Sequence, residues 1–187
     1  MEKFNEVFVS NEPLSKTLKA QDVSSFAQAC DYIRNLPYGR NSDRSDFNLI
    51  LREEKGTCST KHAFLKQLAI ENNIPVELCI GVYKMNAENT KGIGSVLDAN
   101  QLDYIPEAHC YLKFEGKRYD FTKQNSNANM FESVLLFEAS IQPEQIGDYK
   151  VALHQDYIKS WIASEGIPYA FEDVWTIREA CIANLSA

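Results

Sequence analysis

The sequence has no C-x-x-C pair of cysteines, and its five cysteines are odd in number. Paired cysteines are typical of secreted disulfide-bonded domains and of many zinc sites, so this pattern argues against a disulfide framework and favours a reducing compartment. No stretch approaches the ~20 apolar residues of a membrane helix, and the acidic first residues do not resemble a secretory signal. We therefore expect a cytoplasmic protein with no membrane partner.

Positive charge is also scarce, because 19 Lys and Arg residues are set against 26 Asp and Glu residues, for a net charge of −7. A protein that binds nucleic acid needs a basic patch to neutralise phosphates, and none is visible in the sequence, so we expect no nucleic-acid partner. The 187 residues contain no repeat, low-complexity segment or linker. We therefore expect one domain over residues 1–187, with a C-terminal helical part over about residues 155–187.

Hydrophobic periodicity separates the expected helices from the expected strands. Apolar residues at helical spacing predict helices over residues 22–36, 46–54, 58–71, 155–165 and 171–185. Alternation predicts strands over residues 75–84, 108–114, 117–122 and 133–141. Residues 146–153 could form a strand or the start of a helix, and we favour the strand; residues 7–18 are interpreted as an irregular or weakly extended lead-in. The long connection over residues 85–106 is rich in Asn, Gly and Ser, and we expect it to form the rim or lid of a cleft.

One cysteine, Cys58, stands at the start of a predicted helix. Gly56 and Thr57 predict a break in regular structure before it, and Thr57 is the expected N-cap. The helix dipole and the free N–H groups at such a position lower a cysteine pKa from about 8.5 into roughly the 3.5–7.5 range. A thiolate there is a nucleophile, and the same N–H groups can stabilise an oxyanion. The alternative interpretation is a small buried side chain.

A second chemical group, His109, lies on a predicted hairpin whose turn is Glu115–Gly116. This turn places Tyr111 opposite Asp120, so that His109 and Asp120 are diagonal neighbours on one face. The opposite face carries Cys110, Leu112, Phe114, Tyr119 and Phe121. Because that face is apolar, a slip of one residue would bury the charged face, and the register is therefore fixed. A carboxylate beside a histidine orients the ring and stabilises its protonated form.

The order of these groups resembles the transglutaminase-like, papain-related superfamily. The resemblance is carried by Gly-x-Cys at a helix start, a following strand, Ala-His on the next strand and Tyr-Asp on its partner, and it covers about residues 46–122. It implies an α+β fold in which the Cys-bearing helix packs on an antiparallel β-sheet, with extra helices at both ends. It also implies that Cys58 is the nucleophile, His109 the general base and acid, and Asp120 the orienting carboxylate.

The expected function is a cysteine acyl-transfer enzyme, or an amide or peptide hydrolase, that works through a thioester on a peptide, a protein or a small amide. Neither water nor an amine is favoured as the acceptor. The chain lacks the Arg-Gly-Gly-x-Cys motif of arylamine acetyltransferases and any acidic loop with calcium-ligand spacing, so we expect no cofactor and no metal. The alternative is a non-catalytic binding or scaffold module, in which Tyr111 and Arg118 block or repurpose the cleft.

Several other residues are candidates for roles near Cys58. An oxyanion-hole side chain upstream of Cys58 would be Tyr38, Asn41 or Asn48, although the backbone N–H of Cys58 is the safer donor. His62 lies four residues after Cys58 on the same helix face, and with His109 the two would form a partial zinc site.

We interpret His62 instead as a partly buried neighbour of the cleft or a surface residue. We expect His154 on the surface, and Trp161 and Trp175 in the packing of the terminal helices.

Overall fold

The computed structural model describes residues 2–185, so that residues 1, 186 and 187 of the predicted domain lie outside the described part. The helices are α1 (Glu2–Asn5), α2 (Pro13–Lys19), α3 (Phe26–Asn35), α4 (Leu49–Glu53), α5 (Cys58–Glu71), α6 (Gly94–Ala99), α7 (Asp148–Glu165) and α8 (Phe171–Asn184). The strands are β1 (Glu77–Met85), β2 (Ile105–Phe114), β3 (Lys117–Tyr119) and β4 (Leu135–Ile141). They form one antiparallel sheet in the order β3-β2-β1-β4.

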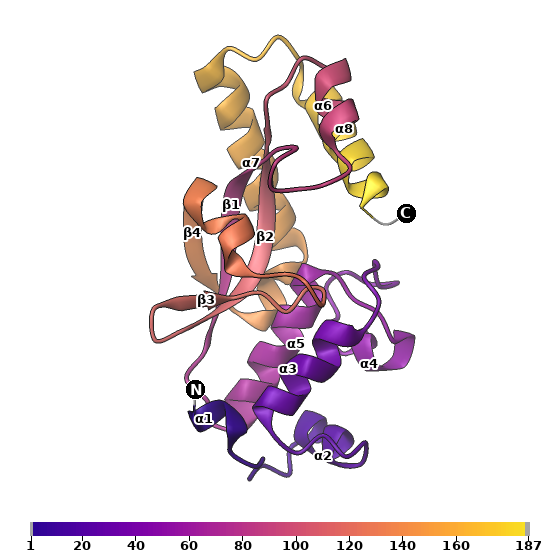
Figure 1. Cartoon of the computed structure of the whole chain (residues 1–187), viewed down its shortest axis with the longest axis vertical. Coiled ribbons are helices and arrows are strands. Elements are labelled where there is room, and N and C mark those ends of the chain that lie inside the picture. Colours follow the sequence, from indigo (N-terminus) through magenta and orange to yellow (C-terminus); the bar gives the residue numbers. More distant parts are fainter. Residues whose placement is uncertain (1, 186–187) are drawn as a thin grey trace.

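The architecture is therefore α+β, as the sequence predicts, with helices at both ends of the sheet (Figure 1). Figure 1 shows α1 to α5 gathered at one end of the long axis, and α6 and α8 at the other end. Helix α7 extends from the sheet to the end that carries α6 and α8. Among the described helices, none combines the length and the apolar character needed to cross a bilayer.

Helix α5 has the bounds that the sequence predicts, and its start is fixed by a capping box. The Thr57 N–H donates to Thr60 Oγ1 at 3.0 Å, which satisfies a backbone donor at the helix entrance. Most of the helix is buried, and Phe64 and Leu68 are fully buried between α3 and the sheet. The thiol of Cys58 is therefore carried by the most enclosed helix of the fold.

The hairpin of β2 and β3 has the predicted register, with Leu112 opposite Tyr119 and Phe114 opposite Lys117. Glu115 and Gly116 both have positive φ angles, 49° and 76°, which is typical of the two-residue turn that matches strand twist. Strand β3 ends earlier than predicted, at Tyr119. The reason is local, because the Asp120 carboxylate accepts the backbone N–H of residue 122 at 2.9 Å and so turns the chain out of the ladder.

Two apolar cores lie along the molecule. The larger core packs α3 and α5 against one face of the sheet. The second core joins α6, α7 and α8 to the ends of β1 and β2, and Trp161 and Val174 are buried in it. The prediction that Trp161 packs the terminal helices is confirmed, and its Nε1 donates to the Tyr104 hydroxyl at 2.9 Å.

The prediction of a strand over residues 146–153 is wrong, because α7 begins at Asp148. The buried positions of α7 are His154, Ile158 and Trp161, which follow helical spacing. The first of them is a histidine, so the apolar period that identifies a helix is interrupted in its second turn.

The lead-in over residues 7–18 is also more regular than predicted, because α2 begins at Pro13. Its N–H groups at Leu14 and Ser15 donate to the Glu71 carboxylate at 3.1 and 2.8 Å. A side chain 56 residues away in the sequence thus caps this helix, and no local pattern reveals such a cap.

Candidate active site

Cys58 is the first residue of α5 and is half-buried, whereas the other four cysteines are buried. The free N–H groups and the dipole at a helix N-terminus favour negative charge there. The site is built around this thiol by residues from three regions of the chain. They come from the loop before α5, from strand β2 with the segment after β3, and from α7 and α8.

The structure brings His109 and Asp120 together, with 3.0 Å between His109 Nε2 and Asp120 Oδ2. Asp120 is buried, and its other oxygen, Oδ1, accepts both the backbone N–H and the hydroxyl of Thr122. The carboxylate is therefore held in one orientation. Since Nε2 of His109 faces Asp120, Nδ1 is left for the Cys58 thiol, and the two groups shift each other's pKa.

Electrostatics favour an ion pair between Cys58 and His109. Burial raises the pKa of the Cys58 thiol, but the Lys150 ammonium and the His109 ring outweigh burial and lower this pKa to about 6. Burial lowers the pKa of His109, but Asp120 and Cys58 raise it well above its usual value. At neutral pH the geometry therefore supports a thiolate beside an imidazolium.

His62 is fully buried, so its interpretation as a surface residue is wrong, and the expected partial burial is an underestimate. The Phe121 N–H donates to His62 Nε2 at 2.8 Å, and His62 Nδ1 donates to the Cys58 carbonyl oxygen at 2.8 Å. Burial lowers the pKa of His62 to about 4, so the ring is neutral. Through these two hydrogen bonds the His62 ring links the segment after β3 to the first turn of α5.

The candidate zinc site of Cys58, His62 and His109 is not assembled, because both ring nitrogens of His62 are already hydrogen-bonded. Across residues 2–185, no group of three or more His, Cys, Asp or Glu side chains is placed to hold a metal ion.

Lys150 is a site residue that the sequence analysis missed. It lies on α7, and its Nζ is 3.7 Å from Cys58 Sγ and donates to Ser59 Oγ at 2.7 Å. The sequence favours a strand for the segment that carries Lys150, and a single lysine gives no sequence pattern that would place it beside Cys58. A helical assignment would have put Lys150 one turn from the buried His154 on the same helix.

A buried ion pair next to the site was also missed. Glu107 lies two residues before His109 on β2, and its carboxylate binds Arg178 of α8 through two hydrogen bonds of 2.7 and 2.6 Å. The alternation of β2 places Glu107 on the same face as His109, so a buried carboxylate there could have been inferred. Its partner on α8 gives no such signal.

His154 is buried, so its prediction as a surface residue is wrong. Its Nε2 donates to the Pro106 carbonyl oxygen at 2.8 Å and lies 3.8 Å from Glu107. Trp175 is half-buried and packs on His154 with ring centroids 5.3 Å apart. It contributes to the wall of a cavity as well as to helix packing.

Of the three oxyanion candidates, only Tyr38 lies beside Cys58. The Asn41 amide is committed to the Glu53 carboxylate and the Lys55 carbonyl oxygen. Asn48 is exposed and donates to its neighbour Asp46. Burial raises the pKa of Tyr38 above its usual value, so its hydroxyl remains a donor.

Two cavities meet at Cys58. The first, here called cavity A, measures about 110 Å³, and its lining includes Arg40, Arg44, Cys58, Lys150, Trp175 and Arg178. The second, cavity B, measures about 320 Å³, and its lining includes Tyr83, Met85, Lys91, His109, Met130 and Phe131. Tyr38 and Cys58 line both cavities.

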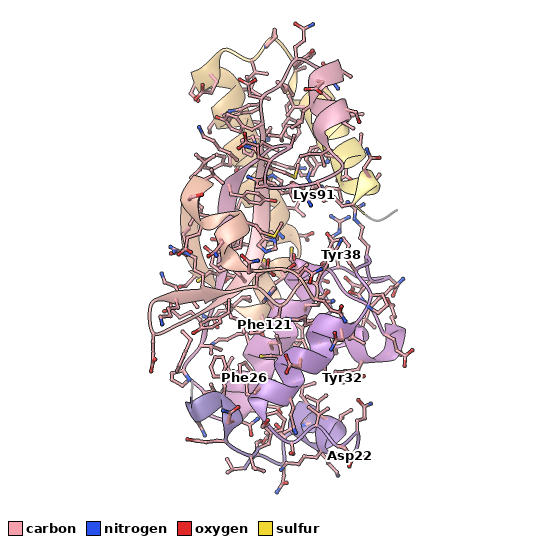
Figure 2. All side chains as sticks on the ribbon, viewed as in Figure 1. Asp22, Phe26, Tyr32, Tyr38, Lys91 and Phe121 are labelled. Atoms are coloured by element: carbon pink, nitrogen blue, oxygen red, sulfur yellow. The ribbon has the colours of Figure 1, made fainter. Side chains whose placement is uncertain are left out.

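The segment over residues 88–91 forms part of the wall of cavity B, so the long connection lies at the rim of the site. Figure 2 shows Tyr38 on the side of the N-terminal helices and Lys91 on the side of α6 and α8. Because Cys58 contributes to the lining of both cavities, the thiol lies where they adjoin, and the two adjoining cavities are here called the channel.

Tyr111 and Arg118 share a face with His109, but they do not obstruct this channel. The Tyr111 hydroxyl and the Arg118 guanidinium both donate to Glu138 of β4, at 2.6 and 2.7 Å. Neither residue lines cavity A or cavity B. Their role in this arrangement is to join strands across the sheet.

Comparisons with known proteins give little further guidance. No protein-family model and no curated protein matches the chain. Among solved structures, a protein of Cytophaga hutchinsonii that is provisionally assigned as a cysteine protease matches with a TM-score of 0.39 and 14% sequence identity. The match covers 67% of this chain and 42% of that protein, so this chain spans less than half of its length. The function is therefore inferred from the geometry of the site.

Proposed function

We propose that this protein is a transglutaminase-like cysteine enzyme that transfers or hydrolyses an acyl group through a thioester at Cys58. The observation that carries the proposal is the connected series of Cys58, His109 and the buried Asp120, with the thiol at a helix N-terminus. Each member lies on a rigid element or is fixed by hydrogen bonds, as nucleophilic catalysis requires.

In the proposed mechanism, the Cys58 thiolate forms a bond to the carbonyl carbon of an amide, and the carbonyl π electrons move to oxygen. The backbone N–H of Cys58 and the Tyr38 hydroxyl donate to this oxyanion. The imidazolium of His109 then gives its proton to the amide nitrogen, the C–N bond breaks and the amine leaves. Asp120 holds the ring in orientation throughout.

The thioester is resolved by reversal of these roles. His109 is neutral after the amine has left, and it accepts a proton from water or from an acceptor amine as that molecule attacks the thioester carbonyl. The C–S bond breaks and the thiolate returns. Water gives hydrolysis, and an amine gives acyl transfer.

The test is the pH dependence of Cys58 alkylation by iodoacetamide, followed by peptide mass spectrometry. We expect Cys58 to react with an apparent pKa near 6 and the His109→Ala variant to lose most of this advantage at neutral pH. Cys30, Cys79, Cys110 and Cys181 serve as internal controls, because burial raises the pKa of each of them.

An ordinary thiol pKa at Cys58, or a thiol that does not react in the folded protein, would overturn the proposal. That result would favour the non-catalytic binding module.

A further inference from the structure

Cavity A carries a surplus of positive charge in a protein whose net charge is −7. Two of its cations, Arg40 and Arg178, are paired with the carboxylate of Glu179, and Arg178 also binds Glu107. The other two, Arg44 and Lys150, have no carboxylate within 4.0 Å among the described residues. The cavity thus holds two cations without a carboxylate partner.

The Cys58 thiolate accounts for only one of these charges. Lys150 is the cation beside the sulfur, and Arg44 contributes to the lining of the same cavity. The four cations of the lining therefore exceed its two carboxylates and the thiolate by one charge. A concave site with one unbalanced positive charge favours a monovalent anion.

The position of His109 indicates which part of the substrate lies in each cavity. His109 lines cavity B and does not line cavity A. In the proposed mechanism the ring gives its proton to the departing nitrogen, which must therefore lie on the side of cavity B. The acyl group that stays on Cys58 then extends toward cavity A.

From this arrangement we infer that cavity A is an acyl-group subsite that selects an acyl group carrying a free carboxylate. The inference rests on the proposed function and adds the substrate class. Cavity B is larger and includes Tyr83, Met85 and Phe131 in its lining, so it is suited to an apolar or aromatic amine as the leaving group.

The first experiment compares two alkylating reagents of similar size, anionic iodoacetate and neutral iodoacetamide, on Cys58 of the whole chain. The informative variant is Arg44→Glu, because Arg44 is exposed and has no described polar partner. Its matched control is Arg52→Glu, an exposed position that lines neither cavity and undergoes the same change of net charge.

We expect Arg44→Glu to lower the rate ratio of iodoacetate to iodoacetamide on the order of fivefold, as a two-unit charge change at a partly solvated site implies. We expect Arg52→Glu to leave the ratio unchanged.

The second experiment uses two amides of 7-amino-4-methylcoumarin, which supplies an aromatic leaving group. One carries a succinyl group and the other a butyryl group, which has the same chain length without the carboxylate. We expect faster release of the coumarin from the succinyl amide and accumulation of a Cys58 acyl adduct by intact mass spectrometry. We also expect Arg44→Glu to reduce this preference.

The outcomes separate the subsite from the function. Equal rates with both amides, or a reagent ratio that Arg44→Glu does not change, would overturn the subsite and leave the activated thiol in place. A Cys58 that reacts with neither reagent would overturn the proposed function itself.

Discussion

At the scale of single residues, the site depends on how many positive groups surround one sulfur. Cys58 lies at the N-terminus of α5, and both His109 and Lys150 lie close enough to lower the pKa of its thiol. A histidine partner alone is enough for nucleophilic catalysis in principle. The lysine adds a second cation that stays charged at neutral pH, and it therefore lowers the pKa of the thiol together with His109.

Substitution of Lys150 by Met is expected to raise the pKa of Cys58 by about one unit, because the thiolate loses a nearby cation. The rate of iodoacetamide alkylation at pH 6 should then fall about fivefold. Lys150→Arg retains the charge and should alkylate at close to the original rate. An unchanged rate profile in Lys150→Met would contradict a role for this lysine in ionising the thiol.

Protonation of the buried His62 is expected to lower the free energy of unfolding in mild acid. Its pKa is about 4 in the folded state and 6.5 in the reference state. The unfolded chain therefore binds more protons between these pH values, so the free energy of unfolding falls as the pH falls through this window, by about 2–3 kcal/mol.

Urea unfolding at pH 6.5 and pH 4.5 measures this loss. In His62→Gln the difference between the two pH values should be smaller, while the contribution of His154 remains in both proteins. An equal difference in the two proteins would show that His62 is not the titrating group.

The three predicted catalytic residues could be placed from the sequence because Cys58 and His109 lie on regular elements with a readable pattern and Asp120 directly follows β3. The apolar face of the hairpin fixes the register, and the register places His109 beside Asp120. Lys150 and Arg178 could not be placed, because they reach the site from helices whose positions depend on tertiary packing. The burial of His62 could not be predicted either, because it depends on the segment after β3 that packs on it.

At the scale of elements, the site depends on close contact between β1 and β2 beneath His109. Gly81 of β1 pairs with His109 of β2. A Cβ atom at Gly81 would lie 2.7 Å from Leu135 Cδ1 and 2.9 Å from the Tyr111 ring. Only glycine leaves room for this packing. The sequence showed this glycine within a strand but gave no indication of which side chains press against it.

Gly81→Ala is therefore expected to destabilise the protein by about 1–3 kcal/mol through overpacking. Urea unfolding gives the change in free energy. Adding Leu135→Ala in the same chain removes one of the two clashes and should recover part of the loss. Full stability in the single variant would mean that the strands can separate without cost.

At the scale of the whole molecule, α8 is attached to the sheet through the ion pair of Arg178 with Glu107. Glu107 is buried and Arg178 is 13% exposed, and both residues contribute to the lining of cavity A. Removing one partner of a buried pair leaves an uncompensated charge, whereas removing both leaves a neutral gap. The sequence indicated neither the pair nor the channel, because both depend on how α8 docks.

Arg178→Met is expected to lower the free energy of unfolding by about 3–5 kcal/mol, because Glu107 remains buried without its partner. The double variant with Glu107→Gln should be less destabilised than the sum of the two single variants. A double-mutant cycle by urea unfolding measures this coupling. Additive effects would show that the pair does not hold α8 in place.

The order of the site residues along the chain has a consequence for the timing of synthesis. Lys150 follows Cys58 by 92 residues, and it lies on α7, which comes after all four described strands in the chain. A ribosome-bound chain that ends before α7 therefore presents Cys58 without one of the cations that lower its pKa. The thiol becomes fully reactive only when the late helices arrive, so a stalled or truncated polypeptide carries a less reactive sulfur than the finished protein.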